Sequence, residues 1–500
     1  MRAQLVAYFE AHHKLVEAGA LQMILTTPQP LDLSRRLIES AGTGSPFVTV
    51  EMVRAAMGPM GAARPGGLRP RAPAPPVAPT APGTPPAMAP AGYFHLIEEG
   101  FIPPTSNRDP LESYGELFAS RFRALTRLLR GRPELSGLRP IGDLGRAEGS
   151  AAVVGMIRDV RQTSEHHHLI IHVEDESGAA ELFVPKDSPA AQLTFLPDEV
   201  VGLTLSIPRE RGKIARVTSV HRPDIPASRP MARSARPSRV LFLSDLHIGS
   251  RSFLDGPWGM LMEFLRGKGP KPEVAREIAH VVVAGDLVDG IGIYPNQERD
   301  LAITDVFQQY EELGRRLREL PERLNVVILP GNHDAVCPAE PQPSLPREFR
   351  ERLPPRIRSV GNPSTFALDG VVVEAYHGRS FDDLIPALPG ASYSRPTDVM
   401  KRMLAMRHLA PIYGGRTPLA PLARDGLVID PAPDILVTGH AHTYGVDRYR
   451  SVLLLNASTW QAETEYQRMR NITPVPARAA VVSLTDLSVE TFDFSGGVPS

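Results

Sequence analysis

Short runs of apolar residues recur through the second half of the chain. Val240–Leu243, Val281–Ala284, Val326–Leu329, Val371–Tyr376 and Ile435–Val437 show no alternation of polar and apolar positions, which is typical of strands buried on both faces. Each run is followed within a few positions by an acidic, amide or imidazole side chain. Because parallel strands end at a common edge of their sheet, we expect these polar side chains to lie together.

Helical periodicity separates these strands, for example at Trp258–Leu265 and Ile303–Leu320. Three later segments, Ser451–Leu455, Ala479–Leu484 and Leu487–Phe494, are expected to form a closing set of antiparallel strands. The pattern predicts an α/β (α+β) fold for residues 240–500. In this fold two mixed sheets form a sandwich with helices outside and the polar residues at one rim.

A different pattern precedes this part, at residues 141–223. Turn signals separate five strand candidates, and a short helix is expected near Ala190–Phe195; the strands are Ala152–Arg161, Leu169–Asp175, Ala179–Pro185, Val200–Ile207 and Lys213–Val220. Five short strands with one late helix suit an OB-type barrel. Its shortage of aromatic residues makes subunit docking at least as good an interpretation as binding of single strands. The run His166-His167-His168 is interpreted as a solvated turn.

The remaining segments are expected to connect or extend these two parts. Residues 1–57 are predicted to be a small helical domain, with Leu15 and Val16 on one helical stripe and a helix at Leu31–Ser40. Residues 58–91 are rich in Pro, Ala and Gly and are predicted to be a disordered linker. Residues 92–140 are predicted to be a helical connecting segment with one helix at Glu112–Arg130, and residues 224–239 a basic linker.

Composition restricts the class of protein. The 500 residues exceed one ordinary core, and 55 basic against 56 acidic residues argue neither for nor against a nucleic-acid partner. The single cysteine, Cys337, excludes an intramolecular disulfide and a thiolate zinc cluster. No window approaches the roughly 20 apolar residues of a membrane helix, and there is no signal-peptide pattern. We therefore expect a cytoplasmic protein with no membrane partner.

The polar residues after the strands suit two divalent ions that share one bridging carboxylate, a centre that activates water to attack a phosphoryl group. Asp286 is expected to bridge. Mixed oxygen and imidazole ligands favour manganese, iron or zinc, and we expect manganese. The predicted ligands of one ion are Asp245, His247, Asp286 and His442, and those of the other are Asp286, Asn332, His377 and His440.

Neighbouring residues are candidates for catalysis and substrate binding. His333 is expected to orient the scissile group or to protonate the leaving oxygen, with Asp334 holding its ring. Arg379 is expected either to clamp a phosphate or to pair with Asp382 or Asp383. Lys401, Arg402 and Arg407, in the segment 399–407, either track a DNA backbone or lie on a solvated helix face.

These blocks resemble the calcineurin-like, or Mre11-like, metallophosphoesterases, whose motifs are Asp-x-His, Gly-Asp-x-x-Asp, Gly-Asn-His-Asp, His and Gly-His-x-His. Within that superfamily the chain is similar to the small subunits of archaeal family D DNA polymerases. The segments that carry this similarity are Ser244–Ser250, Gly285–Gln297, Tyr376–Asp383, Gly439–Thr443 and Pro474–Ala477. The likeness covers residues 141–500 well and residues 1–140 loosely.

The resemblance implies a manganese-dependent 3′-to-5′ exonuclease that proofreads DNA 3′ ends and associates with a large polymerase subunit as a heterodimer or higher assembly, near the nucleoid. Candidate partners of residues 1–57 are a sliding clamp, a primase or the large subunit. Two alternatives stay open. One is a phosphatase or pyrophosphatase that acts on a small molecule, and the other is a non-catalytic scaffold subunit whose site is vestigial.

Overall fold

The computed structural model describes residues 92–102, 109–210, 214–469 and 473–496, together with a few positions before residue 92. The chain divides into two compact units, Met1–Pro85 and Pro86–Ser500. In the first unit, β1 (Leu15–Val16) pairs in parallel with β2 (Phe47–Val48). The prediction that Leu15 and Val16 belong to a helix was therefore wrong. Leu33, Ser34, Arg35 and Leu37 are helical, whereas the predicted linker at 58–91 lies outside the described residues.

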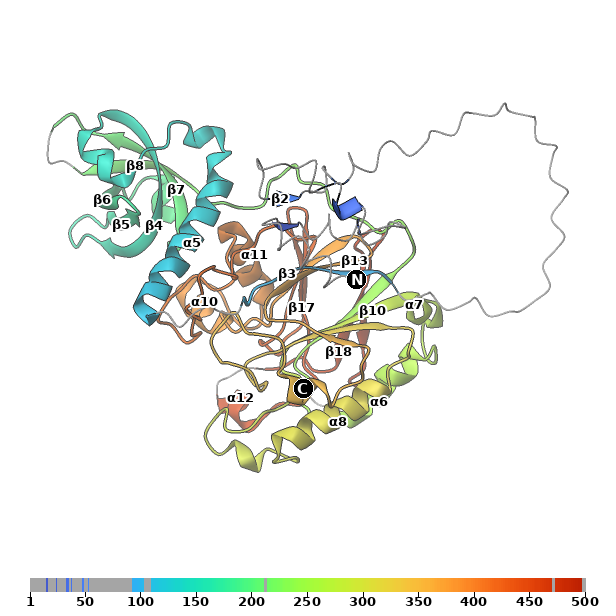
Figure 1. Ribbon diagram of the computed structural model, residues 1–500. Coiled ribbons are helices and arrows are strands. Elements are labelled where there is room, and N and C mark those ends of the chain that lie inside the picture. The colour runs from blue at the N-terminus through green and yellow to red at the C-terminus, as the bar shows by residue number, and fades with distance from the viewer. Residues whose placement is uncertain are drawn as a thin grey trace. The chain divides into compact units, whose positions relative to one another are not determined.

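The second unit contains two six-stranded mixed sheets (Figure 1), as expected for residues 240–500. The first sheet has the order β12-β11-β10-β9-β18-β19, in which β9 to β12 are parallel and β18 is antiparallel to both neighbours. Its strands are β9 (Arg239–Leu243), β10 (Ile278–Ala284), β11 (Asn325–Leu329), β12 (Ile357–Ser359), β18 (Arg478–Ser483) and β19 (Val489–Asp493).

The second sheet has the order β16-β17-β15-β14-β13-β3, with β14, β15 and β17 parallel. Its strands are β3 (Phe94–Glu99), β13 (Ser364–Leu368), β14 (Val371–Ala375), β15 (Ile435–Thr438), β16 (Gly445–Tyr449) and β17 (Val452–Asn456). The expected closing set is therefore divided. Its first strand, β17, belongs to this sheet, and only β18 and β19 pair with each other.

The strand β3 corrects the prediction of a purely helical segment at 92–140. It pairs antiparallel with β13 at the edge of the second sheet, although it lies far from that sheet in the sequence. His95, Leu96 and Ile97 are all exposed. An edge strand without a buried face has no alternating pattern of apolar residues, so hydrophobic periodicity could not identify it.

Alternate side chains of each central strand enter different cores, which explains the unbroken apolar runs. Val240 and Phe242 of β9 face the second sheet. Leu241 and Leu243 instead pack with the helices on the outer face. The first sheet is covered by α6 (Asp255–Leu265), α7 (Pro272–Glu277), α8 (Val306–Arg318) and α9 (Arg347–Arg350), and the second by α10 (Phe381–Ala387) and α11 (Pro396–Met406). Such layering leaves the strand ends as the place for polar groups.

Residues 149–221 form a closed five-stranded barrel with the order β4-β5-β6-β8-β7. The five expected strands are confirmed within a few residues, but the expected helix is one 3-10 turn, Pro189–Gln192. The exposed His166 and His167 lie in the turn after β4, as expected. The strands are β4 (Gly149–Gln162), β5 (Leu169–Asp175), β6 (Gly178–Val184), β7 (Val200–Ile207) and β8 (Ala215–His221).

The helix α5 (Pro110–Arg130) joins the barrel to the sheet sandwich. Asp109 caps it by accepting a hydrogen bond from the amide of Leu111 at 2.8 Å. Leu125 and Leu129 pack on the barrel, whereas Leu117 enters the core beneath the second sheet. The buried Arg121 bonds to Asp425 at 2.6 Å. The predicted packing of this helix onto neighbouring parts of the chain is confirmed.

The predicted basic linker at 224–239 is held to the sheet sandwich by an ion pair. In the predicted basic linker, Arg229 pairs with the buried Asp434 at 2.9 Å, so this segment packs along the sandwich. The described part of the chain includes no helix long and apolar enough to cross a membrane.

Candidate metal centre

The predicted ligands follow β9, β10, β11, β14 and β15, whose carboxyl ends meet at one rim of the two sheets. Five of the seven adopt the left-handed backbone region, with φ between 48° and 63°; these are Asp245, His247, Asp286, His440 and His442. This region is strained for residues other than glycine, and such strain concentrates at functional sites. At Gly439 the chain passes close to the first ligand, because a Cβ there would lie 2.5 Å from Asp245 Oδ2.

The first predicted ligand set converges. Asp245, His247, Asp286 and His442 are buried and can place one ligand atom each within 4.8 Å of the others. His442 Nε2 lies 3.0 Å from His247 Nε2 and 3.3 Å from Asp245 Oδ1. Two imidazole nitrogens and two carboxylates directed at one point form a donor set for a divalent cation.

The second set lies beside the first and shares Asp286. Asp286, His377 and His440 also place ligand atoms within 4.8 Å of one another. His377 Nε2 is 3.3 Å from Asp286 Oδ2 and 3.1 Å from Asn332 Oδ1. His440 Nε2 lies 3.3 Å from Asp382 Oδ1, which leaves Nδ1 for an ion. The structure thus brings all seven predicted residues together, and Asp286 belongs to both groups.

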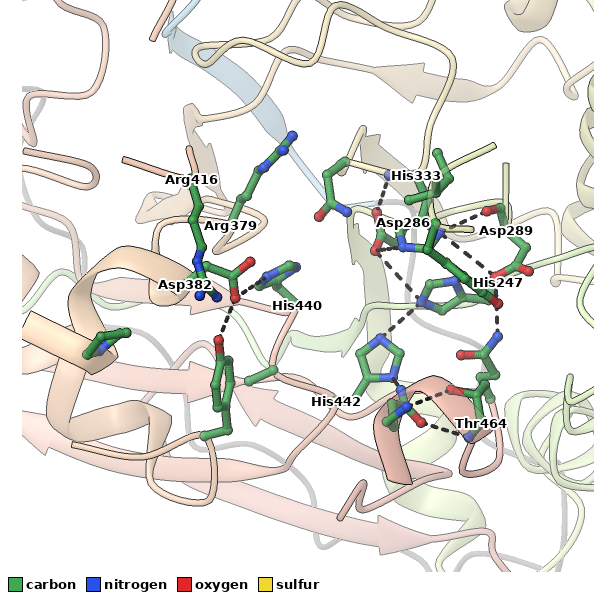
Figure 2. Close-up of a pocket in the computed structure, with 18 residues that line it drawn as sticks. His247, Asp286, Asp289, His333, Arg379, Asp382, Arg416, His440, His442 and Thr464 are labelled. Atoms are coloured by element: carbon green, nitrogen blue, oxygen red, sulfur yellow. Dashed lines mark hydrogen bonds and ion pairs between the residues drawn. The ribbon is translucent and has the colours of Figure 1, made fainter. Parts of the chain in front are cut away.

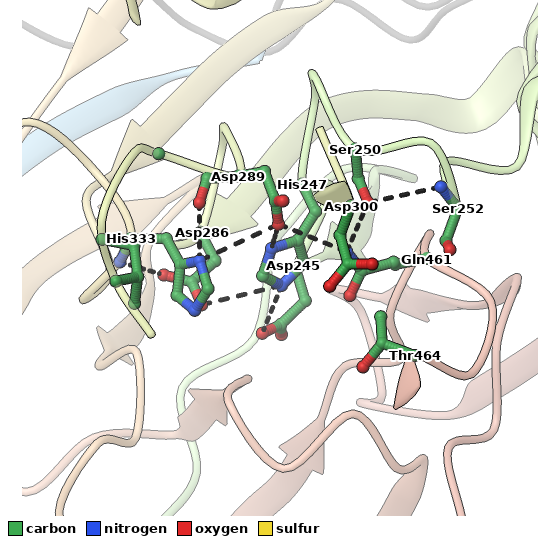
Figure 3. Close-up of polar contacts among 12 residues, drawn as sticks. Asp245, His247, Ser250, Ser252, Asp286, Asp289, Asp300, His333, Gln461 and Thr464 are labelled. Carbon is green, nitrogen blue, oxygen red and sulfur yellow. Dashed lines mark hydrogen bonds and ion pairs between the residues drawn. The ribbon is translucent and has the colours of Figure 1, made fainter. Parts of the chain in front are cut away.

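A further layer of contacts orients these imidazoles (Figure 3). His247 Nδ1 donates to the Asp289 carboxylate at 2.9 Å, and His377 Nδ1 donates to the carbonyl of Ala284 at 2.9 Å. On the third ring, His442 Nδ1 is 2.5 Å from Gln467 Nε2 of the short helix α12 (Glu465–Met469). Bonding one ring nitrogen directs the other toward the centre.

Sequence reasoning missed Asp289, Asp382 and Gln467 as parts of this layer. Asp289 is the second acid of the Gly-Asp-x-x-Asp motif, so the motif itself contained the signal. Asp382 was considered only as a partner of Arg379. Gln467 has no local signal, because it reaches His442 only through the fold.

Charges in the centre interact strongly. Burial opposes a charge on His247, yet its hydrogen bond to Asp289 and the nearby Asp286 raise its pKa to about 9. Burial likewise opposes a charge on His377, but Asp286 raises its pKa to about 10. Against the effect of burial, His377 and His333 hold the pKa of Asp286 well below its usual range. A site that attracts protons this strongly also favours metal cations, which would displace them.

His333 and Asp334 do not interact as predicted. The Asp334 carboxylate accepts hydrogen bonds from the amides of Gly331 and Leu287 and from the Tyr310 hydroxyl. His333 Nδ1 instead donates to the carbonyl of Asp289 at 2.8 Å. Asp334 therefore fixes the turn that carries Asn332, and it is Asp289 that orients the His333 ring.

The centre opens into a pocket of about 370 Å³ (Figure 2). His247, Asp286, Asp289 and His442 lie on one side, and Arg379, Asp382, Arg416 and His440 on the other. Arg379 is anchored by a 3.2 Å hydrogen bond to the carbonyl of Pro338. Asp382 and Asp383 bond to other groups, to Tyr393 and to the Arg416 amide respectively. The alternative in which Arg379 pairs with Asp382 or Asp383 is therefore not found among the described residues.

The structure contradicts both interpretations of the segment 399–407. Arg402 bonds to Glu199 of the barrel at 2.9 Å, and the buried Arg407 donates to the carbonyl of Ile429 at 2.6 Å. Lys401 pairs with Asp447 at 2.5 Å. These cations hold α11 to its neighbours, so they neither track a DNA backbone nor form a solvated face.

The two mixed sheets and the buried carboxylate and imidazole cluster at their rim define a metallophosphoesterase-like α/β protein. The donor set fits divalent metal ions, because each imidazole keeps one nitrogen directed toward neighbouring carboxylates. The structure of an archaeal phosphodiesterase is 11% identical and covers 51% of this chain and 98% of that chain, with a TM-score of 0.27.

Sequence comparison identifies the family. Residues 240–446 match the family of B subunits of DNA polymerases alpha and epsilon. The DNA polymerase II small subunit of Archaeoglobus fulgidus is 41% identical over 374 residues, covering 74% of this chain and 75% of that protein. The corresponding protein of Methanothermobacter thermautotrophicus is 38% identical over 412 residues and covers 80% and 83%. This chain belongs to the archaeal DNA polymerase II small subunits, the small subunits of family D DNA polymerases.

Proposed function

We propose that this chain is a 3′-to-5′ exonuclease that removes nucleotides from DNA 3′ ends by two-metal hydrolysis of a phosphodiester. The observation that carries the proposal is the pair of ligand sets that share Asp286 at the base of one pocket. Ions spaced by a bridging carboxylate are the arrangement used to stabilise both oxygens of an in-line displacement. Membership of a polymerase subunit family makes DNA the expected substrate.

In this proposal, Asp245, His247, Asp286 and His442 hold one ion and Asp286, Asn332, His377 and His440 hold the other. Manganese is the expected metal, since it accepts both oxygen and imidazole ligands. The ions would supply an activated water and neutralise charge on the phosphoryl oxygens. His333 directs Nε2 toward the reacting group, because Nδ1 is engaged by Asp289, and Arg379 binds a phosphate oxygen.

The second part of the proposal concerns assembly. The barrel has the strand order of an OB fold, with β6 parallel to β8 and a short helix between β6 and β7. We assign it to docking of a large polymerase subunit, as a heterodimer or higher assembly. Residues 1–57 are candidates for binding a sliding clamp. A replication protein with these partners would act near the nucleoid.

A nuclease assay tests the proposal directly. A 5′-labelled single-stranded oligonucleotide and a chromogenic phosphomonoester are each incubated with the chain and Mn²⁺. We expect stepwise shortening of the oligonucleotide and little release from the monoester. Asn332→Ala and His333→Ala should each lower the rate at least a hundredfold, whereas His166→Ala, at an exposed histidine of the barrel, should match the wild type.

The outcomes separate the alternatives. A higher rate on the monoester would favour a phosphatase. Activity that does not depend on Asn332 and His333 would reject this centre as the catalyst. If neither substrate reacts, the proposed nuclease function is rejected, and co-purification with a large subunit would support the scaffold alternative.

A further inference from the structure

The pocket extends beyond the predicted metal ligands, and its outer wall has a chemistry that metal binding does not use. Arg379 and Arg416 supply cationic groups to this wall (Figure 2). Tyr393 and Pro386 also line the pocket and supply flat apolar surfaces. Arg416 is exposed, and it belongs to none of the ion pairs found among the described residues. Because Arg416 lines the pocket beside the two ligand sets, an anionic ligand in the pocket would meet this cation.

The contacts give the order of groups from the metal centre outward. His440 is a predicted ligand, and its Nε2 lies 3.3 Å from the Asp382 carboxylate. Asp382 also accepts from the Tyr393 hydroxyl at 2.5 Å. Although burial opposes its charge, His440 and, more weakly, Arg416 hold the pKa of Asp382 below its usual range. Arg416 is therefore close enough to Asp382 to act on its charge.

Arg416 is presented by a loop that is firmly anchored. The Asp383 carboxylate accepts hydrogen bonds from the amides of Arg416 at 2.6 Å and Thr417 at 2.9 Å. The chain passes so close to this carboxylate that a Cβ at Gly415 would lie 2.4 Å from Asp383 Oδ1. Fixed backbone contacts reduce the conformational freedom that a binding residue would lose on meeting its ligand.

The same loop is tied to the barrel and to α5. Asp198 lies between the 3-10 turn Pro189–Gln192 and β7. It accepts a hydrogen bond from the Tyr413 amide at 2.8 Å. Arg121 of α5 donates to the carbonyl of Pro411 at 2.6 Å. Tyr413 also packs on Tyr114 of α5, with ring centroids 5.0 Å apart. The position of Arg416 at the pocket thus depends on parts of the chain outside the sheet sandwich.

The charge of the pocket also favours a polyanion once the ions bind. Asp245, Asp286, Asp289 and Asp382 supply four negative charges against two positive charges from Arg379 and Arg416, so two divalent ions in place of the imidazole protons would make the site net positive. A negatively charged backbone would then be attracted both to the centre and to the outer arginines.

We propose that Arg416, with Tyr393 and Pro386, forms a subsite for the phosphate and base of the nucleotide next to the scissile one in a single strand. This inference rests on the proposed nuclease function and adds the substrate's form. The pocket at its mouth offers one flat wall and one anchored cation, which suit an unpaired nucleotide that stacks while its phosphate is held. A base-paired end would have to bring its complementary strand to the same mouth.

The test compares substrates with and without a neighbouring phosphate. Wild type, Arg416→Ala and Arg416→Glu are assayed with Mn²⁺ on single-stranded oligonucleotides of two to six nucleotides and on bis(p-nitrophenyl) phosphate, which has one phosphodiester only. We expect Arg416→Ala to lower kcat/KM on the longer oligonucleotides at least tenfold more than on the small diester, mainly through KM. Arg416→Glu should have a larger effect, and the difference should appear once the strand supplies a second phosphate.

Arg350→Ala is the matched control, because Arg350 is exposed on α9 and does not line the pocket. Equal loss on both substrates, or no loss on either, would overturn the subsite. A wild type inactive on all substrates would instead reject the proposed function. In that case the subsite is judged by fluorescence anisotropy of a labelled hexanucleotide with Mn²⁺, where Arg416→Glu must weaken binding at least tenfold relative to Arg350→Ala.

Discussion

Two buried clusters of charged residues differ in what they leave unsatisfied. Between the barrel and α11, Glu199 accepts from Arg222 at 2.5 Å, from Arg402 at 2.9 Å and from the Leu196 amide at 3.2 Å. At the rim of the sheets, His247 and His442 instead approach each other through their Nε2 atoms at 3.0 Å, beside two carboxylates. The carboxylate of the first cluster is paired with two arginines of the same chain, whereas the second cluster directs its donor atoms at a shared point.

This difference shows that buried charge alone does not identify a functional site. Both clusters join segments that lie far apart in the sequence. In the cluster of Glu199, opposite charges meet with fixed geometry, so its role is to hold the barrel against the sandwich. In the metal centre, imidazoles and carboxylates keep lone pairs for a common ligand. The orientation of the remaining lone pairs is therefore the diagnostic feature.

The largest expected effect comes from removing the shared carboxylate. Asp286→Asn should lower the nuclease rate about a thousandfold or more, because both ligand sets lose a charge. Calorimetric titration with Mn²⁺ should show loss of binding. Retained Mn²⁺ affinity would contradict the bridging role of Asp286.

In the cluster of Glu199, loss of the carboxylate should instead lower stability and leave metal binding unchanged. Glu199→Ala leaves Arg222 and Arg402 buried without their carboxylate, so the free energy of unfolding should fall by about 3 kcal/mol. Urea denaturation measures this loss, and Mn²⁺ affinity should not change. As a control, Glu351→Ala breaks the exposed pair with Arg347 and should cost less than about 1 kcal/mol. A large drop in Mn²⁺ affinity for Glu199→Ala would remove the distinction between the clusters.

A smaller effect is expected from the layer that orients the ligands. Asp289→Asn keeps the shape of the side chain that bonds His247 but removes its charge. Mn²⁺ affinity and nuclease rate should each fall about 10- to 100-fold, as is usual for such partners of metal-ligating histidines. Asp255→Asn, on the exposed surface of α6, serves as the control. An effect as large as that of Asp286→Asn would make Asp289 a ligand itself.

A separate effect, confined to a range of pH, is expected outside both clusters. Burial raises the pKa of Glu374 to about 7, although its hydrogen bond from Thr365 opposes the rise. Because the folded state holds this proton more tightly than the unfolded chain, stability falls as pH rises from about 4.5 to 7, by up to about 3 kcal/mol.

Glu374→Gln should remove this dependence. The variant should melt at a higher temperature than wild type at pH 8, with little difference at pH 5. A thermal melt at the two pH values is sufficient. If the variant were less stable at both, Glu374 would be ionised and stabilising in the fold.

The sequence by itself was sufficient for the elements with strong local patterns. The apolar runs of β9, β10 and β11 and the stripe of α5 were found because their residues are buried on continuous faces. The convergence of the seven candidate ligands could also be predicted, because each closely follows a strand and strand ends in a parallel sheet share an edge. The chemistry of this centre is thus determined by residue type and position along the chain.

Only the tertiary structure decided which distant residues support that centre. The edge strand β3 has no buried face to give it a pattern, and Gln467 reaches His442 only because α12 folds back over the rim. Asp334 lies next to His333 in sequence, yet the turn directs its carboxylate to Gly331 and Leu287. Arg402, which looks like a surface cation on α11, is held by Glu199 of the barrel. Local sequence specifies which groups are available, but contacts between distant segments select the partner of each, since that selection depends on packing geometry.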